Sequence, residues 1–297
     1  MKKQIFILIL LFLSIFSIFT FSNGKKIITF FVSYNPLNTP TSPRNFEIKI
    51  DGKRYPSQKI IFLKGMPKNY MVAMGNTGGI AKNFGNIIWF NKGLISNYLF
   101  DDNFHMYLYS PKGVRILVPP GLSRIEIEKK FFNFLPYMLF NGVFEKNFKN
   151  ISPLKNKNLN PLENCIITLS KVASKYSNNA KKSIIIFTDG TYKINKEKVK
   201  DFFKNPIQTF FIYISDKKSR YFKSICSFAK IAGGKVYFVP SKANILPSIC
   251  NNVNFIIENT YMIEIDPEEF KGKKIDIKIK LKNLKGITLS YPKFIYK

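Results

Sequence analysis

Apolar and polar residues along positions 68–258 follow two periods that alternate along the chain. Residues 70–74 and 183–187 are almost continuously apolar, with Ser183 as the one small polar residue, which is typical of parallel strands covered on both faces. Residues 161–176 instead carry apolar side chains at the spacing of one helix face, and Pro161 suits a first helical turn. The alternation predicts an α/β fold with a doubly wound, mostly parallel sheet and helices on both of its faces.

Further strands and helices are expected along the same stretch, separated by turn residues. The expected strands are residues 70–74, 104–109, 114–118, 183–187, 207–214 and 235–239. The expected helices are residues 80–98, 122–133, 161–176, 195–204, 219–231 and 243–257. Asp101 and Asp102 stand before an expected strand, and we expect them to form a solvated turn.

The segments on either side of this region have the period of strands. Residues 46–50 alternate between apolar and polar, and Asp51-Gly52 follows as a hairpin turn, so residues 59–63 are the expected partner strand. Further strands are expected at residues 261–265, 275–281 and 287–291. The two flanks together predict a small antiparallel β-region beside the α/β domain.

The N-terminus has the pattern of an export signal. Lys2 and Lys3 precede an almost unbroken apolar run over residues 5–21, and Thr20 and Ser22 suit cleavage after position 22. The protein is therefore expected to be periplasmic, on the cell surface or secreted. The alternative is a retained anchor, because a helix at the short end of the range can still span a bilayer. Such an anchor is the only membrane contact that the sequence predicts.

These patterns divide the chain into four parts. Residues 1–23 are the signal peptide or signal anchor, and residues 25–66 are an N-terminal β-region. Residues 68–258 form the α/β domain. Residues 260–297 are C-terminal strands that pack with the N-terminal β-region.

The charge of the chain is strongly positive and carried mostly by lysine. There are 47 Lys and Arg against 18 Asp and Glu, a formal net charge of +29, and only five of the basic residues are arginines. Such a surface attracts anionic partners, for example an acidic protein or an anionic envelope polymer. Specific nucleic-acid readout relies on arginine forks and exposed aromatic rings at a definite site. No such cluster stands out, so specific nucleic-acid binding is not expected.

The reactive residues are few. Three cysteines without a C-x-x-C pair and the single histidine, His105, are too few for a zinc finger or a Cys/His catalytic site. Cys226 and Cys250 stand on consecutive expected helices and can form a disulfide in an oxidising compartment, which leaves Cys165 unpaired. His105 is expected to pack within a strand. No nucleophile and base pair indicates an enzyme.

Two loops follow the strongest expected strands, at the edge where open α/β sheets bind ligands. They are the glycine-rich residues 75–79 and the Thr-Asp-Gly tripeptide at 188–190. Together with the helix, Gly-Gly turn and strand of residues 229–237, they resemble a von Willebrand factor A (VWA) domain. The flanking β-elements resemble those around this domain in a group of exported bacterial proteins. The resemblance implies protein–protein interaction or adhesion.

In that family, five positions hold a divalent cation that bridges to an acidic group of the ligand. By resemblance these positions fall on Gly75, Thr77, Gly79, Asn160 and Asp189. Two glycines supply no ligand and Asn160 no charge, whereas Mg²⁺ typically takes one or two carboxylates in a near-octahedral oxygen shell. The resemblance therefore implies a degenerate adhesion site and a candidate ligand-binding face without a metal or other cofactor. The alternative is that Asp189 only caps its turn.

The leading hypothesis is thus an exported, non-enzymatic VWA-like binding or scaffold protein that holds another protein without a cation, and the basic charge favours an acidic partner. The alternative hypothesis is a basic protein of the envelope or of extracellular nucleic acid that binds polyanions. Salt separates the two, because polyanion binding depends steeply on ionic strength.

Overall fold

A computed structural model describes most of the chain. It covers residues 25–34, 42–56, 59–96, 98–129, 149–153, 158–176, 180–241, 244–282 and 288–297. The expected signal segment, residues 1–23, and the end of the expected helix 122–133 lie outside this set. Within it, no helix is both long and apolar enough to cross a membrane.

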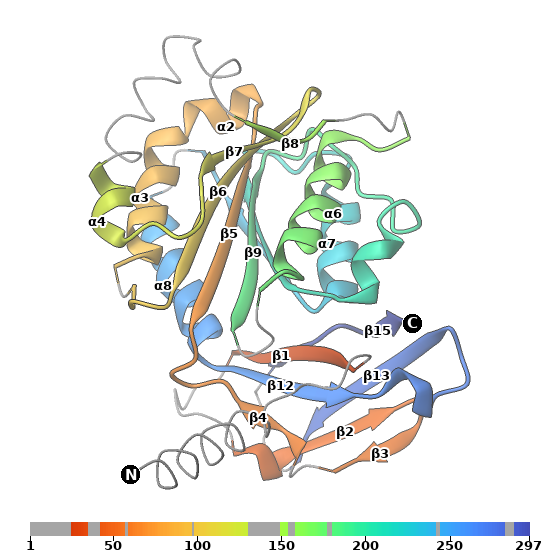
Figure 1. Cartoon of the computed structure of the whole chain (residues 1–297). Helices are drawn as coiled ribbons and strands as arrows, with labels where there is room; N and C mark the ends of the chain where they lie inside the picture. The colour runs from red at the N-terminus through yellow and green to blue at the C-terminus, as the bar shows by residue number, and fades with distance from the viewer. Residues whose placement is uncertain are drawn as a thin grey trace, which may run out of the picture.

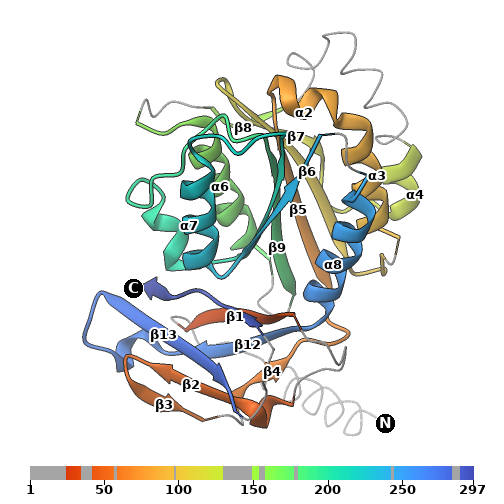
Figure 2. The same cartoon turned by 180° about the vertical axis from the view of Figure 1, so that it is seen from behind.

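A seven-stranded sheet forms the centre of the α/β domain (Figures 1 and 2). Its strands, in spatial order, are β11 (Lys235–Val239), β10 (Gln208–Ile214), β9 (Lys181–Thr188), β5 (Lys68–Gly75), β6 (Asn103–Ser110), β7 (Gly113–Val118) and β8 (Asn150–Ser152). β5 pairs in parallel with both β9 and β6. β7 is antiparallel to both of its neighbours, β6 and β8. The winding reverses between β5 and β9, so the predicted doubly wound α/β class is confirmed.

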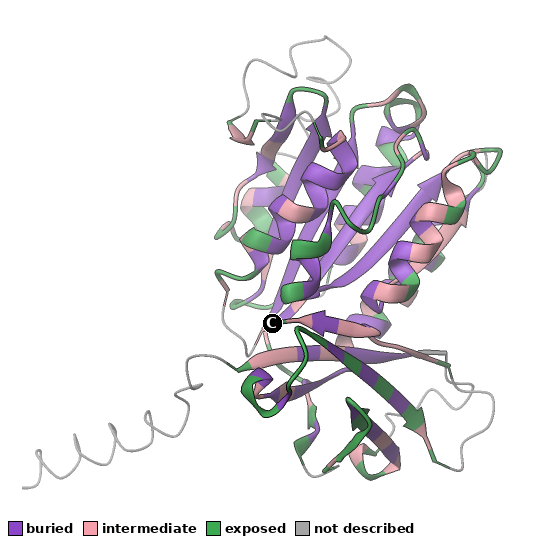
Figure 3. Cartoon of the chain, turned by 90° about the vertical axis from the view of Figure 1, so that its right-hand side faces the viewer, coloured by how far each residue is buried: buried purple, intermediate pink, exposed green. Residues whose placement is uncertain are grey.

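Helices cover both faces of this sheet (Figure 1). One layer consists of α2 (Gly78–Lys82), α3 (Phe84–Leu94), α4 (Arg124–Ile127) and α8 (Leu246–Glu258). The other consists of α6 (Pro161–Ala173), α7 (Phe222–Ala232) and the 3-10 helix η5 (Lys200–Lys204). Figure 3 shows the strands buried between the layers. Alternate residues of β5 face the two sides, with Val72 in one core and Met71 in the other.

A small β-sandwich lies against the amino-terminal edge of the central sheet (Figures 1 and 2). One of its sheets has the order β14 (Thr288–Ser290), β1 (Lys26–Tyr34), β12 (Thr260–Ile265) and β4 (Ile61–Phe62). The other has the order β15 (Phe294–Tyr296), β13 (Lys274–Leu281), β2 (Phe46–Ile50) and β3 (Lys53–Tyr55). The short 3-10 helices η1 (Pro43–Asn45) and η6 (Pro267–Glu269) lie in its connections. Phe30 packs inside the sandwich, whereas its neighbour Phe31 joins the core of the α/β domain.

Residues 59–63 are not the partner strand of residues 46–50, so that prediction is wrong. Asp51 and Gly52 both have positive φ, as a two-residue hairpin turn requires, and the chain returns at once as β3. Residues 61–62 instead pair with β12, where the rings of Phe62 and Tyr261 stack with centroids 4.8 Å apart.

Residues 195–204 do not form the expected α-helix. They make turns followed by η5, with Val199 and Phe202 buried three positions apart, and three residues is the period of a 3-10 helix. In the expected helix 122–133, α4 ends at Ile127.

Four charged side chains meet where β5 and β9 begin. The ammonium groups of Lys68 and Lys181 are almost fully buried, and each lies 2.8 Å from a different carboxylate oxygen of Glu258 at the end of α8. Asp102 lies 3.4 Å from the Lys68 ammonium and accepts hydrogen bonds from the backbone N–H groups of Lys68 and Leu99. The expectation of a solvated turn is therefore wrong for Asp102, which is buried.

The charges in this cluster set the pKa of Glu258. Burial by itself raises that pKa, but the hydrogen bonds and charges of Lys181 and Lys68 outweigh it and hold the pKa below its ordinary value. The stabilisation from Glu258 is therefore complete above the pKa of the unfolded chain and is lost as the pH falls through the folded value.

Glu258→Gln should destabilise the protein by about 1–2 kcal/mol at neutral pH, because two buried ammonium groups lose their shared counter-charge, whose own side chain is 43% exposed and screened by water. Urea unfolding from about pH 7 down to about pH 3 measures the effect. The wild type should lose more stability over this range than the variant does. Glu197→Gln removes an exposed carboxylate and should follow the wild-type profile. An equal flattening in both variants would contradict the assigned role of Glu258.

Candidate functional site

The two predicted loops lie side by side at the carboxyl ends of β5 and β9. A Cβ atom built on Gly79 would stand 2.8 Å from Oδ2 and 2.9 Å from Cβ of Asp189. Both distances are shorter than the van der Waals contacts that a Cβ atom makes with other heavy atoms, so only glycine fits at position 79 without a shift. The sequence placed these loops at the carboxyl ends of two strong strands, and the structure makes those strands neighbours and brings the loops into contact.

Gly75 likewise leaves room for a neighbouring side chain, that of Tyr109 of β6. A Cβ atom on Gly75 would lie 3.0 Å from the Tyr109 hydroxyl, which donates a 3.0 Å hydrogen bond to the carbonyl oxygen of Phe187. Burial raises the pKa of Tyr109 well above its ordinary value, so the phenol stays protonated and keeps donating. The Tyr109 ring therefore fills the space that a longer side chain at position 75 would need.

Asp189 holds its own turn together. Its Oδ1 atom accepts hydrogen bonds from the backbone N–H of Thr191 at 3.1 Å and from the Thr191 hydroxyl at 2.7 Å. Gly190 has a φ of +78°, and a Cβ there would collide with Tyr213 and Ser219. The Thr-Asp-Gly sequence is thus fixed by backbone geometry as well as by the carboxylate.

Asn160 caps helix α6. Its Oδ1 accepts from the N–H groups of Leu162 at 3.0 Å and Glu163 at 3.1 Å, and its amide donates to the Lys193 carbonyl at 2.6 Å. Glu163 completes a capping box by accepting from Asn160 N–H at 3.0 Å, and its other oxygen accepts from Asn195 N–H at 2.8 Å. The sequence-based reasoning missed Glu163, although Asn160-x-x-Glu163 has the spacing of a capping box.

These residues do not fit a divalent cation. Asn160 has committed its oxygen to a helix terminus, and Asp189 has committed one of its two. What remains is the second oxygen of Asp189 and the hydroxyl of Thr77, which is buried and has no hydrogen-bond partner. Mg²⁺ requires about six oxygen ligands in near-octahedral array. Elsewhere in the described part of the chain, no group of three or more His, Cys, Asp or Glu side chains could hold a metal ion.

His105 belongs to a closed chain of buried hydrogen bonds. Its Nδ1 lies 2.9 Å from the Tyr107 hydroxyl and its Nε2 lies 3.1 Å from Oδ1 of Asn69. Burial lowers the pKa of His105 to about 4, so the ring is neutral at physiological pH. As expected, His105 packs within its strand.

The expected disulfide between Cys226 and Cys250 is wrong. Both side chains are free thiols, and so is that of Cys165. The reason is topological, because α7 and α8 cover opposite faces of the sheet. The thiol of Cys250 instead donates to the carbonyl of Phe90, with a sulfur–oxygen distance of 3.3 Å.

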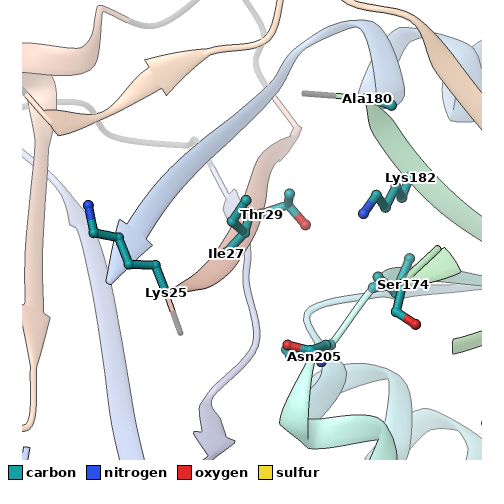
Figure 4. Close-up of a pocket in the computed structure, with 9 residues that line it drawn as sticks. Lys25, Ile27, Thr29, Ser174, Ala180, Lys182 and Asn205 are labelled. Carbon is teal, nitrogen blue, oxygen red and sulfur yellow. The ribbon is translucent and has the colours of Figure 1, made fainter. Parts of the chain in front are cut away.

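A cavity of about 220 Å³ lies at the other end of the sheet, between β1 and the start of β9 (Figure 4). Its polar lining comes from Lys25, Thr29, Ser174, Lys182 and Asn205. Lys182 extends toward Thr29, whereas Lys25 points away. Burial lowers the pKa of Lys182 to about 8, so this amine is still mostly protonated at neutral pH. The lining suits a small anion and is remote from the two loops.

Comparison with known proteins supplies likeness in fold only. No protein-family profile and no curated protein matches the chain. A von Willebrand factor type A protein from Catenulispora acidiphila matches at 10% identity over 90% of this chain and 72% of that chain, with a TM-score of 0.47. Manganese-loaded TRAP protein from Plasmodium vivax matches at 12% identity over 82% and 97%, with a TM-score of 0.43. The SpRpn10 VWA domain matches at 12% over 62% and 94%, with a TM-score of 0.39.

The sheet is doubly wound and mostly parallel, as the sequence predicted. β5 stands between two parallel neighbours, and the antiparallel strand β7 lies beside β6. At these identities the matched proteins transfer no ligand, partner or activity to this chain.

Gly79→Ala should destabilise the protein by about 1–2 kcal/mol, because the new methyl group overlaps Asp189. In an Asp189→Gly background, which also removes the overlapping Cβ of Asp189, the cost should fall by about 1 kcal/mol, since contacting residues couple in a double-mutant cycle. Urea unfolding of the four proteins measures the coupling. Gly78→Ala is the matched control, because a Cβ at Gly78 meets nothing within 4 Å. Additive costs for Gly79 and Asp189 would show that the contact carries no energy.

Proposed function

We propose that this chain is an exported, non-enzymatic binding protein that holds another protein at the carboxyl edge of its central sheet without a bridging cation. The single observation that carries this proposal is the filling of the degenerate adhesion site. Tyr109 stands against Gly75 and Asp189 against Gly79, so side chains of the protein occupy the space of two missing cation ligands. A partner must therefore be recognised by the shape and polar groups of the loops themselves.

The loops offer a rigid polar surface for such contacts. Asn76 and Thr191 are exposed and follow β5 and β9, two strands that are buried between helical layers. Gly78 and Gly79 have no side chains, which lets a partner approach the backbone of the first loop closely. Binding residues are commonly placed on loops that a rigid sheet positions.

The charge of the chain supports an acidic partner. The formal net charge of +29 steers anionic molecules toward the surface and raises association rates at low ionic strength. The same charge also fits the alternative function of polyanion binding, whether the polyanion is an envelope polymer or extracellular nucleic acid. Export is supported by the lysines and the apolar run of residues 2–21, read as a cleaved signal.

Calorimetric titration of the full chain with Mg²⁺, Mn²⁺ and Ca²⁺ tests the absence of a bridging cation. We expect no saturable heat with any of the three ions, and the same result for Asp189→Ala, because Asp189 has a single uncommitted oxygen. Saturable binding that Asp189→Ala abolishes would overturn the proposal and restore a cation-bridged mode.

Site-specific photo-crosslinking tests where the partner binds. A photoreactive amino acid at Thr191 should yield a discrete protein adduct in cells, and the same label at exposed Lys271 in the β-sandwich should not. The adduct should survive EDTA, nuclease and about 0.5 M NaCl, which screens exposed charges beyond a few ångströms. Adducts that form equally at both positions and vanish in salt would favour the polyanion alternative.

A further inference from the structure

The exposed apolar side chains gather on one helical layer. Eight large hydrophobic side chains are exposed in the described part of the chain, and six of them belong to α3, α4, α8, the residue before α8 or the segment between α3 and β6. They are Trp89, Leu99, Phe100, Ile125, Ile245 and Phe255. The other two, Ile61 and Met66, precede β5. The opposite layer of α6, α7 and η5 contributes none to this set. We call the outer surface of α3, α4 and α8 the α3–α8 face.

The helices of this face are packed against one another, so the exposed groups share one surface. Cys250 of α8 donates to the carbonyl of Phe90, and Asn254 donates to the carbonyl of Gly93 at 3.3 Å. Arg124 of α4 donates to the Ser96 carbonyl at 2.6 Å, just beyond the end of α3. Figures 1 and 2 show α3, α4 and α8 on the same side of the sheet.

Trp89 is the most unusual residue of the face. It is the only tryptophan in the chain and its side chain is 69% exposed. The ammonium of Lys92 lies 4.9 Å from the centre of its ring. Beside Trp89 runs a groove of about 570 Å³ between α3 and α8, whose apolar lining includes Phe90 and Leu246. A cation next to an exposed aromatic ring over an apolar groove suits a ligand that is both anionic and apolar.

The part of the face formed by α3 and α8 carries little negative charge, whereas α4 contributes Glu126 and also Glu128, which pairs with Arg124 at 3.0 Å. No Asp or Glu occurs between Asp51 and Asp101, a stretch that contains α2 and α3. None occurs between Asp216 and Glu258, which covers all of α8 before its last residue. The nearby charges of α2 and α3 are therefore cationic, with Lys82 exposed and Lys92 half-buried.

This composition favours a lipid surface over a protein surface. Cores of protein interfaces are depleted in lysine, whereas clustered lysines attract anionic membranes at about 1 kcal/mol each. Tryptophan and phenylalanine beside lysine are typical of the membrane–water interface. The apolar tips are also spread over three helices instead of converging in one pocket, as insertion into a headgroup layer requires.

We propose that the α3–α8 face docks peripherally on an anionic lipid bilayer, with Trp89 and its apolar neighbours entering the headgroup region and Lys82 and Lys92 binding lipid phosphates. This surface is separate from the loop edge that binds the protein partner, so the two contacts can exist together. The inference does not depend on the proposed protein-binding function.

Quenching of Trp89 by brominated lipid tests the proposal on the full chain. Residues 5–21 can enter a bilayer by themselves, so co-sedimentation with vesicles alone cannot tell the two contacts apart. Vesicles of phosphatidylcholine with about 30% brominated phosphatidylglycerol should quench the emission of Trp89, relative to the same vesicles without bromine. Because Trp89 is the only tryptophan, quenching reports contact of this face itself. The effect should decline with added NaCl and be absent on pure phosphatidylcholine.

Paired variants locate the contact. Lys82→Gln with Lys92→Gln should weaken vesicle binding, read by quenching, by about 30-fold, since each lysine near the surface adds about fivefold. Lys223→Gln with Lys230→Gln removes the same charge from exposed positions of α7, on the opposite layer, and should leave quenching unchanged. Phe100→Ser with Ile125→Ser should reduce quenching, whereas Met66→Ser should not.

Three outcomes would overturn the proposal. The first is sedimentation with vesicles without quenching of Trp89, which would assign membrane contact to residues 5–21 alone. The second is equal loss in the two lysine pairs, which would reduce the contact to net charge. The third is a Trp89 emission shift with an acidic amphipathic peptide and none with vesicles, which would reassign the face to protein docking.

Discussion

The fold depends on the buried ion-pair cluster at the amino-terminal edge of the central sheet. Lys68 and Lys181 begin the two strands between which the winding reverses, and both are held by the carboxylate of Glu258. Glu258 ends α8, two residues before β12 enters the sandwich. The cluster therefore sets the start of β5 and β9 relative to each other and to the β-sandwich. Two ammonium groups buried without it would each carry a large desolvation cost.

The same two strands fix the candidate site at their other ends. Because β5 and β9 are paired in register from Lys68 opposite Lys181 to Met74 opposite Phe187, the loops that follow them emerge side by side. At this end of the strands, side-chain packing and not ion pairing fixes the positions of the loops. Asp189 lies against Gly79 and Tyr109 against Gly75, so side chains of the chain itself fill the space between the loops.

Much of this arrangement could be predicted from the sequence, because it depends on local patterns. Continuous apolar runs indicate β5 and β9, and the Thr-Asp-Gly turn requires a glycine at positive φ. The capping box at Asn160 also has a local signature. Contacts between distant segments have none. Nothing near Asp102 shows that Lys68 lies against it, and no local pattern puts Tyr109 into the space beside Gly75.

Two further sequence predictions failed because a linear pattern shows neither which face of a sheet a helix covers nor which strands pair. Cys226 and Cys250 occupy consecutive helices, but α7 precedes the edge strand β11 on one face of the sheet and α8 follows it on the other face. Residues 59–63 are mostly apolar and were the expected partner of β2, but the two-residue turn at Asp51 and Gly52 pairs β2 with the nearer residues of β3.

Positive charge alone does not locate function in this chain, because lysine is spread over nearly every element. What distinguishes one surface from another is what accompanies the lysines. On α6 and η5, acidic or buried polar groups accompany them, as Asp201 pairs with Lys204 at 2.9 Å. On the α3–α8 face, Lys92 has an exposed indole beside it, in a stretch of chain without a carboxylate. The exposed apolar side chains beside the lysines, more than the number of cations, therefore make that face the one suited to an anionic, partly apolar surface.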